Sequence, residues 1–226
     1  LSNIKLLHTG VDTVRQLYAG KPCMHLFDQI IETYREGRGA TIDLFGTTWI
    51  VGAGNTNSGF RYRLQNNELG VIVLFYARHT KAEDIGTHLK IELSPHFIHE
   101  RSTADIQTYL DSIAKELLAH VEPMGCAVHL ALDVQGWKPP KDFMDRFVTR
   151  SKKVTKIDGI DDFSFNHGTI ATTYGNAETF MFGTASALQC CIYNKTKEAH
   201  ARDKIHFWES IWNTASSDDP TVSDYD

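Results

Sequence analysis

A succession of strand-like runs, joined by connections of hairpin length, constrains the fold of this chain more than any other feature. Such runs cover residues 41–51, 60–64, 70–77 and 87–93. In the last run, THLKIEL, polar and apolar residues alternate, as they do in a strand with one buried face. A connection as short as residues 65–68 joins antiparallel neighbours. The sequence therefore predicts an α+β fold with a central, mostly antiparallel β-sheet and flanking helices on one or both faces.

The clearest predicted helix covers residues 102–121. Ser102 and Asp105 form a capping pair at its start, and Pro123 and Gly125 are expected to end it. Its apolar residues recur at three- and four-residue steps and are Ile106, Leu110, Ile113, Leu117 and Val121. This spacing puts them on one face of a helix, so we expect that face to pack against the sheet.

Shorter signals place the remaining elements. Helices are expected at residues 21–38 and 141–150, strands at 10–15, 126–134, 163–172, 179–183 and 204–212, and a surface turn at 94–100.

The domain organisation follows from length and charge. Residues 1–215 are expected to form one folded region, with two packed β-rich halves at about 1–95 and 96–215 as an alternative. Residues 216–226 are expected to be a flexible acidic tail, and removing its four aspartates brings the formal charge from −5 to −1.

Two basic runs are candidates for DNA contacts. A negative total charge argues against a nucleic-acid partner, because Lys and Arg supply most of the affinity for phosphate, but local clusters can act independently of the total. The candidates are Arg61 and Arg63 in one run and Lys152 and Lys153 in the other, and a solvated face is the alternative for each.

Membrane insertion and secretion are not predicted. No apolar run approaches the length that crosses a bilayer, and the first ten residues lack the apolar core of a signal peptide. We therefore expect a cytoplasmic protein. Its cysteines show no metal-binding spacing and are expected to be reduced, buried thiols; they are Cys23, Cys126, Cys190 and Cys191.

The segment at residues 182–198 holds the most suggestive chemistry. Tyr193 and Lys195 are two residues apart, so both side chains point the same way if the segment stays extended. An ammonium group beside a phenol favours its ionised form, which is the nucleophile. The alternative is an ordinary strand that carries a half-buried tyrosine and a solvated lysine.

A family resemblance gives this pair a function. The signature Gly-Ser…Ile-Tyr-Asp-Lys…Glu of the replication initiation factor family resembles a set of residues here, namely Gly183, Ser186, Ile192, Tyr193, Lys195 and Glu198. That family contains the rolling-circle initiators of small plasmids and filamentous phages and related relaxases. The resemblance implies that Tyr193 is the nucleophile that cuts one DNA strand and that Lys195 assists it.

The strand HLALD resembles a second motif of that family, Asp-Leu-Ala-x-Asp. Asp133 matches the second aspartate, whereas His129 replaces the first and Ala127 stands where an arginine is usual. On a straight strand His129 and Asp133 lie about 13 Å apart, too far to share one ion. Within the resemblance, Asp133 is the stronger ligand candidate.

Two further carboxylates complete the predicted metal set. Glu209 resembles the glutamate of the family's Arg-x-Glu strand, with Phe207 in place of the arginine, and the alternative is that it faces water. The resemblance implies Mg²⁺ or Mn²⁺ held by Asp133, Glu209 and His129, with Glu92 in reserve.

The predicted function is thus that of a rolling-circle replication initiator with a relaxase-like nicking domain. The resemblance implies metal-dependent nicking and rejoining of origin DNA, single-stranded or in a hairpin, through a 5′-phosphotyrosine, by an enzyme that acts as a homodimer and recruits a host helicase. A conjugative relaxase of an integrative element is the alternative within this class. The alternative outside it is a sequence-specific DNA-binding module without catalysis.

Overall fold

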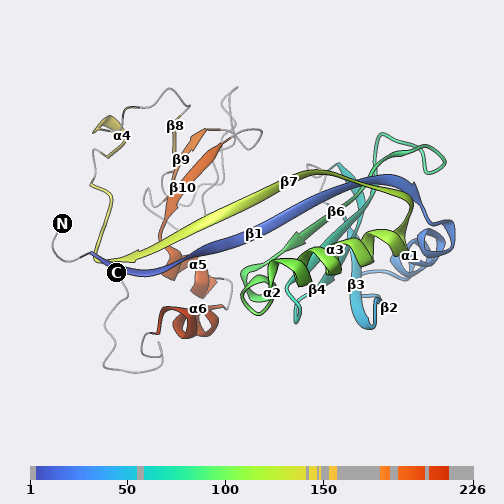
Figure 1. Cartoon of the computed structure of the whole chain (residues 1–226), viewed down its shortest axis with the longest axis horizontal. Coiled ribbons are helices and arrows are strands. Elements are labelled where there is room, and N and C mark those ends of the chain that lie inside the picture. Colours follow the sequence, from blue (N-terminus) through green and yellow to red (C-terminus); the bar gives the residue numbers. More distant parts are fainter. Residues whose placement is uncertain are drawn as a thin grey trace. The chain divides into compact units, whose positions relative to one another are not determined.

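A seven-stranded sheet with the strand order β2-β3-β4-β5-β6-β1-β7 dominates the computed structural model of the chain (Figure 1). The structure describes residues 4–54, 59–140, 143–146, 148, 153–156, 179–183, 188–201 and 204–213. Neighbouring strands from β2 through β6 to β1 pair in antiparallel fashion. The prediction of an α+β fold with a large antiparallel sheet is confirmed.

The strands of this sheet are β1 (Lys5–Pro22), β2 (Thr41–Leu44), β3 (Thr47–Ala53), β4 (Phe60–Asn66), β5 (Val71–Ala77), β6 (Gly86–Leu93) and β7 (Leu118–Gln135). The single strand predicted at residues 41–51 is a hairpin, β2 and β3. Its two-residue turn consists of Phe45 and Gly46, both with positive φ (55° and 73°). Because phenylalanine rarely adopts that backbone conformation, the turn could not be recognised from the sequence.

Three helices pack against one face of the sheet, and they are α1 (Met24–Glu36), α2 (Pro95–His99) and α3 (Thr103–Leu117). Ile30, Phe97 and Ile113 of these helices join one hydrophobic cluster with Val73 and Ile91 of the sheet. The surface turn predicted at residues 94–100 is wrong, because Pro95 opens α2 and Phe97 is only 1% exposed. Because side chains alternate along a strand, those between the core residues point to the other face of the sheet.

Helix α3 begins as predicted and ends earlier than predicted. The Ser102 hydroxyl accepts a hydrogen bond from the Asp105 amide, and the Asp105 carboxylate accepts one from the Ser102 amide. The helix stops at Leu117, and Pro123 and Gly125 lie inside β7 instead of ending a helix. Strand β7 is the last in the sheet order, so a proline without an amide proton is tolerated there.

A second, three-stranded antiparallel sheet has the order β10-β9-β8. Its strands are β8 (Lys153–Lys156), β9 (Thr179–Gly183) and β10 (Gln189–Tyr193), and the helices that accompany it are α4 (Phe143–Arg146), α5 (Lys195–Ala201) and α6 (Ile205–Trp212). The strand predicted at residues 163–172 and the predicted acidic tail lie outside the described residues, and of the helix predicted at 141–150 the structure describes α4.

The strand predicted at residues 204–212 is wrong, because this segment forms helix α6. Its buried residues are Ile205, Trp208, Glu209 and Trp212, at helical steps of three, four and seven. The aromatic content suggested a strand, whereas the spacing of the buried side chains is that of a helix. Glu209 therefore lies on a helix and not on the strand that the family resemblance implied.

The chain divides into two structural units. One consists of Gly10–Ala131, and the other combines Leu1–Thr9 with Leu132–Asp226. Strands β1 and β7 each contribute residues to both units. All four cysteines are free, but the expectation that they are buried is wrong, because Cys23 is half-buried and the other three are exposed. Among the helices of the described residues, none is long and apolar enough to cross a membrane.

Candidate active site around Tyr193

Tyr193 is the last residue of β10, and the chain turns into α5 directly after it. The Asn194 side chain accepts a hydrogen bond from the Lys197 amide at 3.0 Å, and the Asn194 carbonyl accepts one from the Glu198 amide at 3.2 Å. These two bonds fix the start of the helix. The segment is therefore not extended through Lys195, and the strand geometry on which the Tyr-Lys prediction rested is wrong.

The two side chains nevertheless meet. The Lys195 ammonium donates to the Tyr193 phenol oxygen at 3.1 Å, lies 3.2 Å from the Glu198 carboxylate and sits 4.2 Å from the centre of the Trp208 ring. The Lys195 side chain is only 15% exposed, so it is not the solvated lysine of the alternative interpretation. An ammonium in this position stabilises negative charge on the phenol oxygen.

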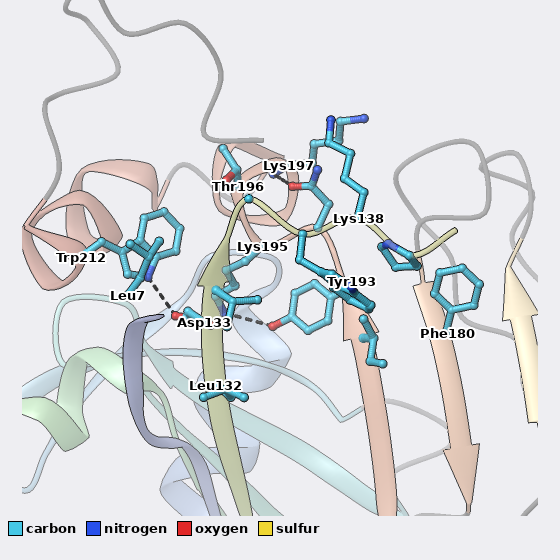
Figure 2. A pocket seen from close by; sticks show the side chains of 16 residues that line it. Leu7, Leu132, Asp133, Lys138, Phe180, Tyr193, Lys195, Thr196, Lys197 and Trp212 are labelled. Atoms are coloured by element: carbon cyan, nitrogen blue, oxygen red, sulfur yellow. Dashed lines mark hydrogen bonds between the residues drawn. The ribbon is translucent and has the colours of Figure 1, made fainter. Parts of the chain in front are cut away.

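The Tyr193 side chain lines a pocket with a volume of about 350 Å³ (Figure 2). Among the described residues that line this pocket, three are lysines, Lys138, Lys195 and Lys197, and one is acidic, Asp133. Lysines thus outnumber acidic residues in the described lining, although Glu198 pairs with Lys195 beside it. Such a pocket is suited to an anionic ligand.

Asp133 lies at the end of β7 and lines the same pocket. Its carboxylate accepts a hydrogen bond from the Trp212 indole at 2.9 Å. Trp212 in turn stacks on Trp208, with ring centres 5.8 Å apart. Figure 2 shows Asp133 between Trp212 and the Tyr193 phenol. Asp133 and Tyr193 thus line the same pocket, and their joint role in a site stays a prediction.

Glu209 is buried on α6, with 5% of its surface exposed, so the alternative that it faces water is wrong. Its carboxylate lies 3.2 Å from Nδ1 of His206 one helical turn earlier. A buried carboxylate needs such partners, because an unpaired charge in the interior is costly.

Glu92 and His129 lie in the other structural unit. The Glu92 carboxylate is 2.6 Å from the Lys90 ammonium and 3.6 Å from the Arg15 guanidinium, so basic side chains already balance its charge. Burial lowers the pKa of His129, and the Arg15 charge lowers it further against the opposing effects of Asp12 and Glu92. In this environment His129 favours its neutral form.

The four predicted metal ligands belong to different units, Glu92 and His129 to one and Asp133 and Glu209 to the other. Over the described ranges, no three His, Cys, Asp or Glu side chains gather as metal ligands do. The ion therefore stays a prediction, and the chemistry below is argued from Tyr193 and the side chains around it.

The predicted DNA-contacting residues are spread over both sheets. Arg61 and Arg63 lie on β4, where the Arg61 guanidinium covers the Tyr76 ring at 5.0 Å. Lys153 begins β8, and Lys152 lies outside the described residues.

Several pocket residues were not predicted from the sequence. Trp137, Lys138 and Lys197 line the pocket, and Trp212 holds Asp133. The four-residue spacing of Trp208 and Trp212 was the one feature of the sequence that could have indicated that both lie on one face of a helix. Trp137 and Lys138 reach the pocket from the end of β7, a placement that only the tertiary fold reveals.

The fold and the site define an α+β protein that presents a tyrosine and lysine pair in a pocket whose described lining holds more lysines than acidic residues. No protein-family model matches the chain, and no solved structure matches it. It is 45% identical over 221 residues to the uncharacterized protein ORF430 of Pseudomonas phage Pf1. The alignment covers 96% of this chain and 49% of the phage protein, so the chain spans about half the length of that relative. The similarity fits a phage origin.

Proposed function

We propose that this chain is the nicking part of a phage rolling-circle replication initiator and that Tyr193 cuts and rejoins single-stranded DNA. The observation that carries the proposal is the contact of 3.1 Å between the Lys195 ammonium and the Tyr193 phenol oxygen, at a pocket with an excess of lysines. The resemblance of residues 183–198 to the initiator signature and the similarity to a phage protein support it.

The reaction is a transfer of a phosphoryl group from a sugar oxygen to the phenol and back. The Tyr193 oxygen attacks phosphorus, the bond from phosphorus to the 3′ oxygen breaks, and the DNA 5′ end becomes a phosphotyrosine. The phenolic proton passes to solvent, which Tyr193 contacts with 37% of its surface, and the released 3′ oxygen takes up a proton. Attack by a 3′-hydroxyl reverses both bond changes and reseals the strand.

Side chains around Tyr193 have separate roles in this reaction. Lys195 stabilises the phenolate before attack, and Glu198 and Trp208 hold the Lys195 ammonium in place. Lys138 and Lys197 increase the local concentration of phosphate. Dependence on Mg²⁺ or Mn²⁺ stays a prediction, with Asp133 and Glu209 as the candidate ligands in this unit.

The test is covalent capture of DNA. The chain is incubated with random-sequence single-stranded oligonucleotides labelled at the 3′ end, because the 3′ fragment is the part that stays attached. We expect a labelled protein band with the wild type and none with Tyr193→Phe, which has no nucleophilic oxygen. Tyr34→Phe is the matched control, since Tyr34 is exposed to a similar degree, 40% against 37%. A band of undiminished intensity with Tyr193→Phe would refute the assignment.

The same assay tests the metal prediction. We expect adduct formation with Mg²⁺ or Mn²⁺ and its loss in EDTA, because a divalent ion neutralises the non-bridging phosphate oxygens. An equal yield in EDTA would show that the chain cuts without a metal.

A DNA-binding module without catalysis is the second candidate. It is favoured by the departures from the family motifs, since Ala127 and Phe207 stand where arginines are expected and His129 replaces an aspartate. If the wild type binds single-stranded DNA but forms no adduct with either ion, this second function replaces the first.

A further inference from the structure

We propose that the pocket beside Tyr193 is a subsite for one unstacked nucleotide of a DNA single strand, with its base against Trp137 and its phosphates at Lys138 and Lys197. The proposal rests on the proposed function for the identity of the ligand as DNA. It adds which side chains hold the base and which hold the phosphates.

The pocket has the size and composition for a nucleotide. Its volume of about 350 Å³ lies within the range of about 300–1,000 Å³ that encloses small organic ligands. Apolar residues such as Leu132, Pro139 and Ile192 share its lining with the lysines. A nucleotide likewise combines a flat apolar base with an anionic phosphate.

Trp137 provides a supported aromatic surface. Its ring meets Phe143 edge-on with centres 5.8 Å apart, and Phe143 meets Phe180 and Phe182 edge-on at 5.3 and 6.3 Å. Phe180 and Phe182 are buried, whereas Trp137 is half-buried and lines the pocket. Phe143 therefore supports the Trp137 ring, while part of the ring remains accessible to a base. Stacking on such a ring is largely independent of base identity.

The charged part of the subsite is the pair Lys138 and Lys197. Both side chains are exposed and line the pocket, and Figure 2 shows them on one side of Tyr193. The acidic lining residue, Asp133, is bonded to the Trp212 indole. Positive charge at an aromatic surface is the combination that binds single strands, because phosphates and unpaired bases are contacted together.

The ligand expected from this arrangement is a single strand and not a duplex. A base within a duplex is stacked on both sides, and it has to leave the helix before it can contact a ring inside a pocket. A single strand exposes its bases without that cost. Binding should therefore be weaker for a duplex of the same sequence and length.

The experiment measures equilibrium binding without cleavage. The Tyr193→Phe protein in EDTA is titrated into a fluorescent 12-nucleotide single strand and into its duplex. We expect Trp137→Leu in this background to weaken single-strand binding by about tenfold or more, in line with the loss of one stacked base. Trp137→Phe keeps an aromatic surface and should bind within about threefold of the parent protein.

A salt series tests the phosphate contacts with variants at exposed positions that do not threaten folding. Lys138→Gln and Lys197→Gln should each reduce the slope of log K against log salt by about 0.7, the value for one phosphate contact with a single strand. Lys115→Gln, at an exposed position of α3 in the other unit, is the matched control and should leave the slope unchanged.

Three results would each overturn the subsite. The first is that Trp137→Leu, with unchanged thermal unfolding, binds the single strand as tightly as the parent protein does. The others are lysine variants that keep the parent's salt slope and a duplex that binds as tightly as the single strand. These outcomes do not depend on covalent capture. A chain that shows the binding pattern but no adduct retains the subsite and loses the nicking proposal, and the reverse result does the opposite.

Discussion

The contact between Lys195 and Tyr193 arises from a local geometry that differs from the one expected from the sequence. Two residues of strand would have placed the side chains on the same face, but the chain turns at Asn194 into α5. The turn brings the Lys195 ammonium back to the phenol and also to Glu198 and Trp208. The sequence could therefore predict the pair, whereas the partners that immobilise Lys195 depend on where α5 and α6 pack.

His88 is a second residue whose environment has a measurable consequence. Its ring is fully buried, and Nδ1 accepts a hydrogen bond from the Ala77 amide. Nε2 consequently carries the proton, and it faces the Asp84 carbonyl at 3.2 Å. A second proton, on Nδ1, would remove the acceptor for the Ala77 amide and place two N–H groups against each other. Burial is the main cause that lowers the pKa of His88.

We predict that His88 makes the unit Gly10–Ala131 sensitive to acid. In the unfolded chain the His88 imidazole takes up a proton below about pH 6.5, whereas in the folded state its pKa is lower and it stays neutral. The unfolding free energy therefore has its full value above that pH and falls as the pH drops toward the folded pKa. His88→Gln should lose less unfolding free energy than the wild type between pH 7.5 and 5.5 in urea titrations. His25→Gln, at an exposed position of α1, should behave as the wild type. An H88Q protein with undiminished acid sensitivity would contradict this role.

At the scale of elements, the sequence predicted what is encoded locally. Alternation in THLKIEL gave β6, and the Ser102 and Asp105 pair gave the start of α3. What failed depends on the surroundings. Pro123 reads as a helix terminator, yet it lies in β7, where the position at the end of the sheet order makes a proline acceptable. In α6 the aromatic content outweighed the helical spacing that the buried residues follow.

We predict that the capping box of α3 contributes about 1 kcal/mol to the unfolding free energy of its unit. Ser102→Ala removes the acceptor for the Asp105 amide, which is then left without its partner. Ser112→Ala is the control on the same helix, because Ser112 is exposed and bonds only locally to Tyr109. Urea unfolding should separate the two variants, since an exposed substitution of this kind changes stability by less than about 0.5 kcal/mol. Equal effects would mean that the cap does not stabilise α3.

At the scale of the whole molecule, the two units have separate hydrophobic cores. The cluster beneath the seven-stranded sheet lies within residues 10–131, and the cluster of Ala199, Ile205, Trp208 and Trp212 belongs to the other unit with Leu7. Cores without shared residues can unfold in separate transitions. The sequence did not reveal this division, because it falls inside β1 and β7 and no linker marks it.

The tryptophans allow this independence to be measured. Trp49 lies in the unit Gly10–Ala131, whereas Trp137, Trp208 and Trp212 lie in the other. In a Trp49→Phe background, fluorescence therefore reports one unit only. We expect that adding Ser102→Ala leaves the fluorescence midpoint unchanged and lowers the midpoint seen by circular dichroism. A shift of both midpoints by the same amount would show that the chain unfolds as one cooperative body.

The unit around Tyr193 combines two separate stretches of the chain, residues 1–9 and 132–226. This arrangement affects the order in which the two cores can form during synthesis. Leu7 precedes residues 10–131 in the chain, but the residues it packs against belong to α5 and α6, which follow them. Residues 10–131 have all their own partners once translation passes Ala131. Because domains generally fold as units during synthesis, the large sheet can form while the start of β1 still lacks its partners in α5 and α6, and the surface around Tyr193 is assembled after that sheet.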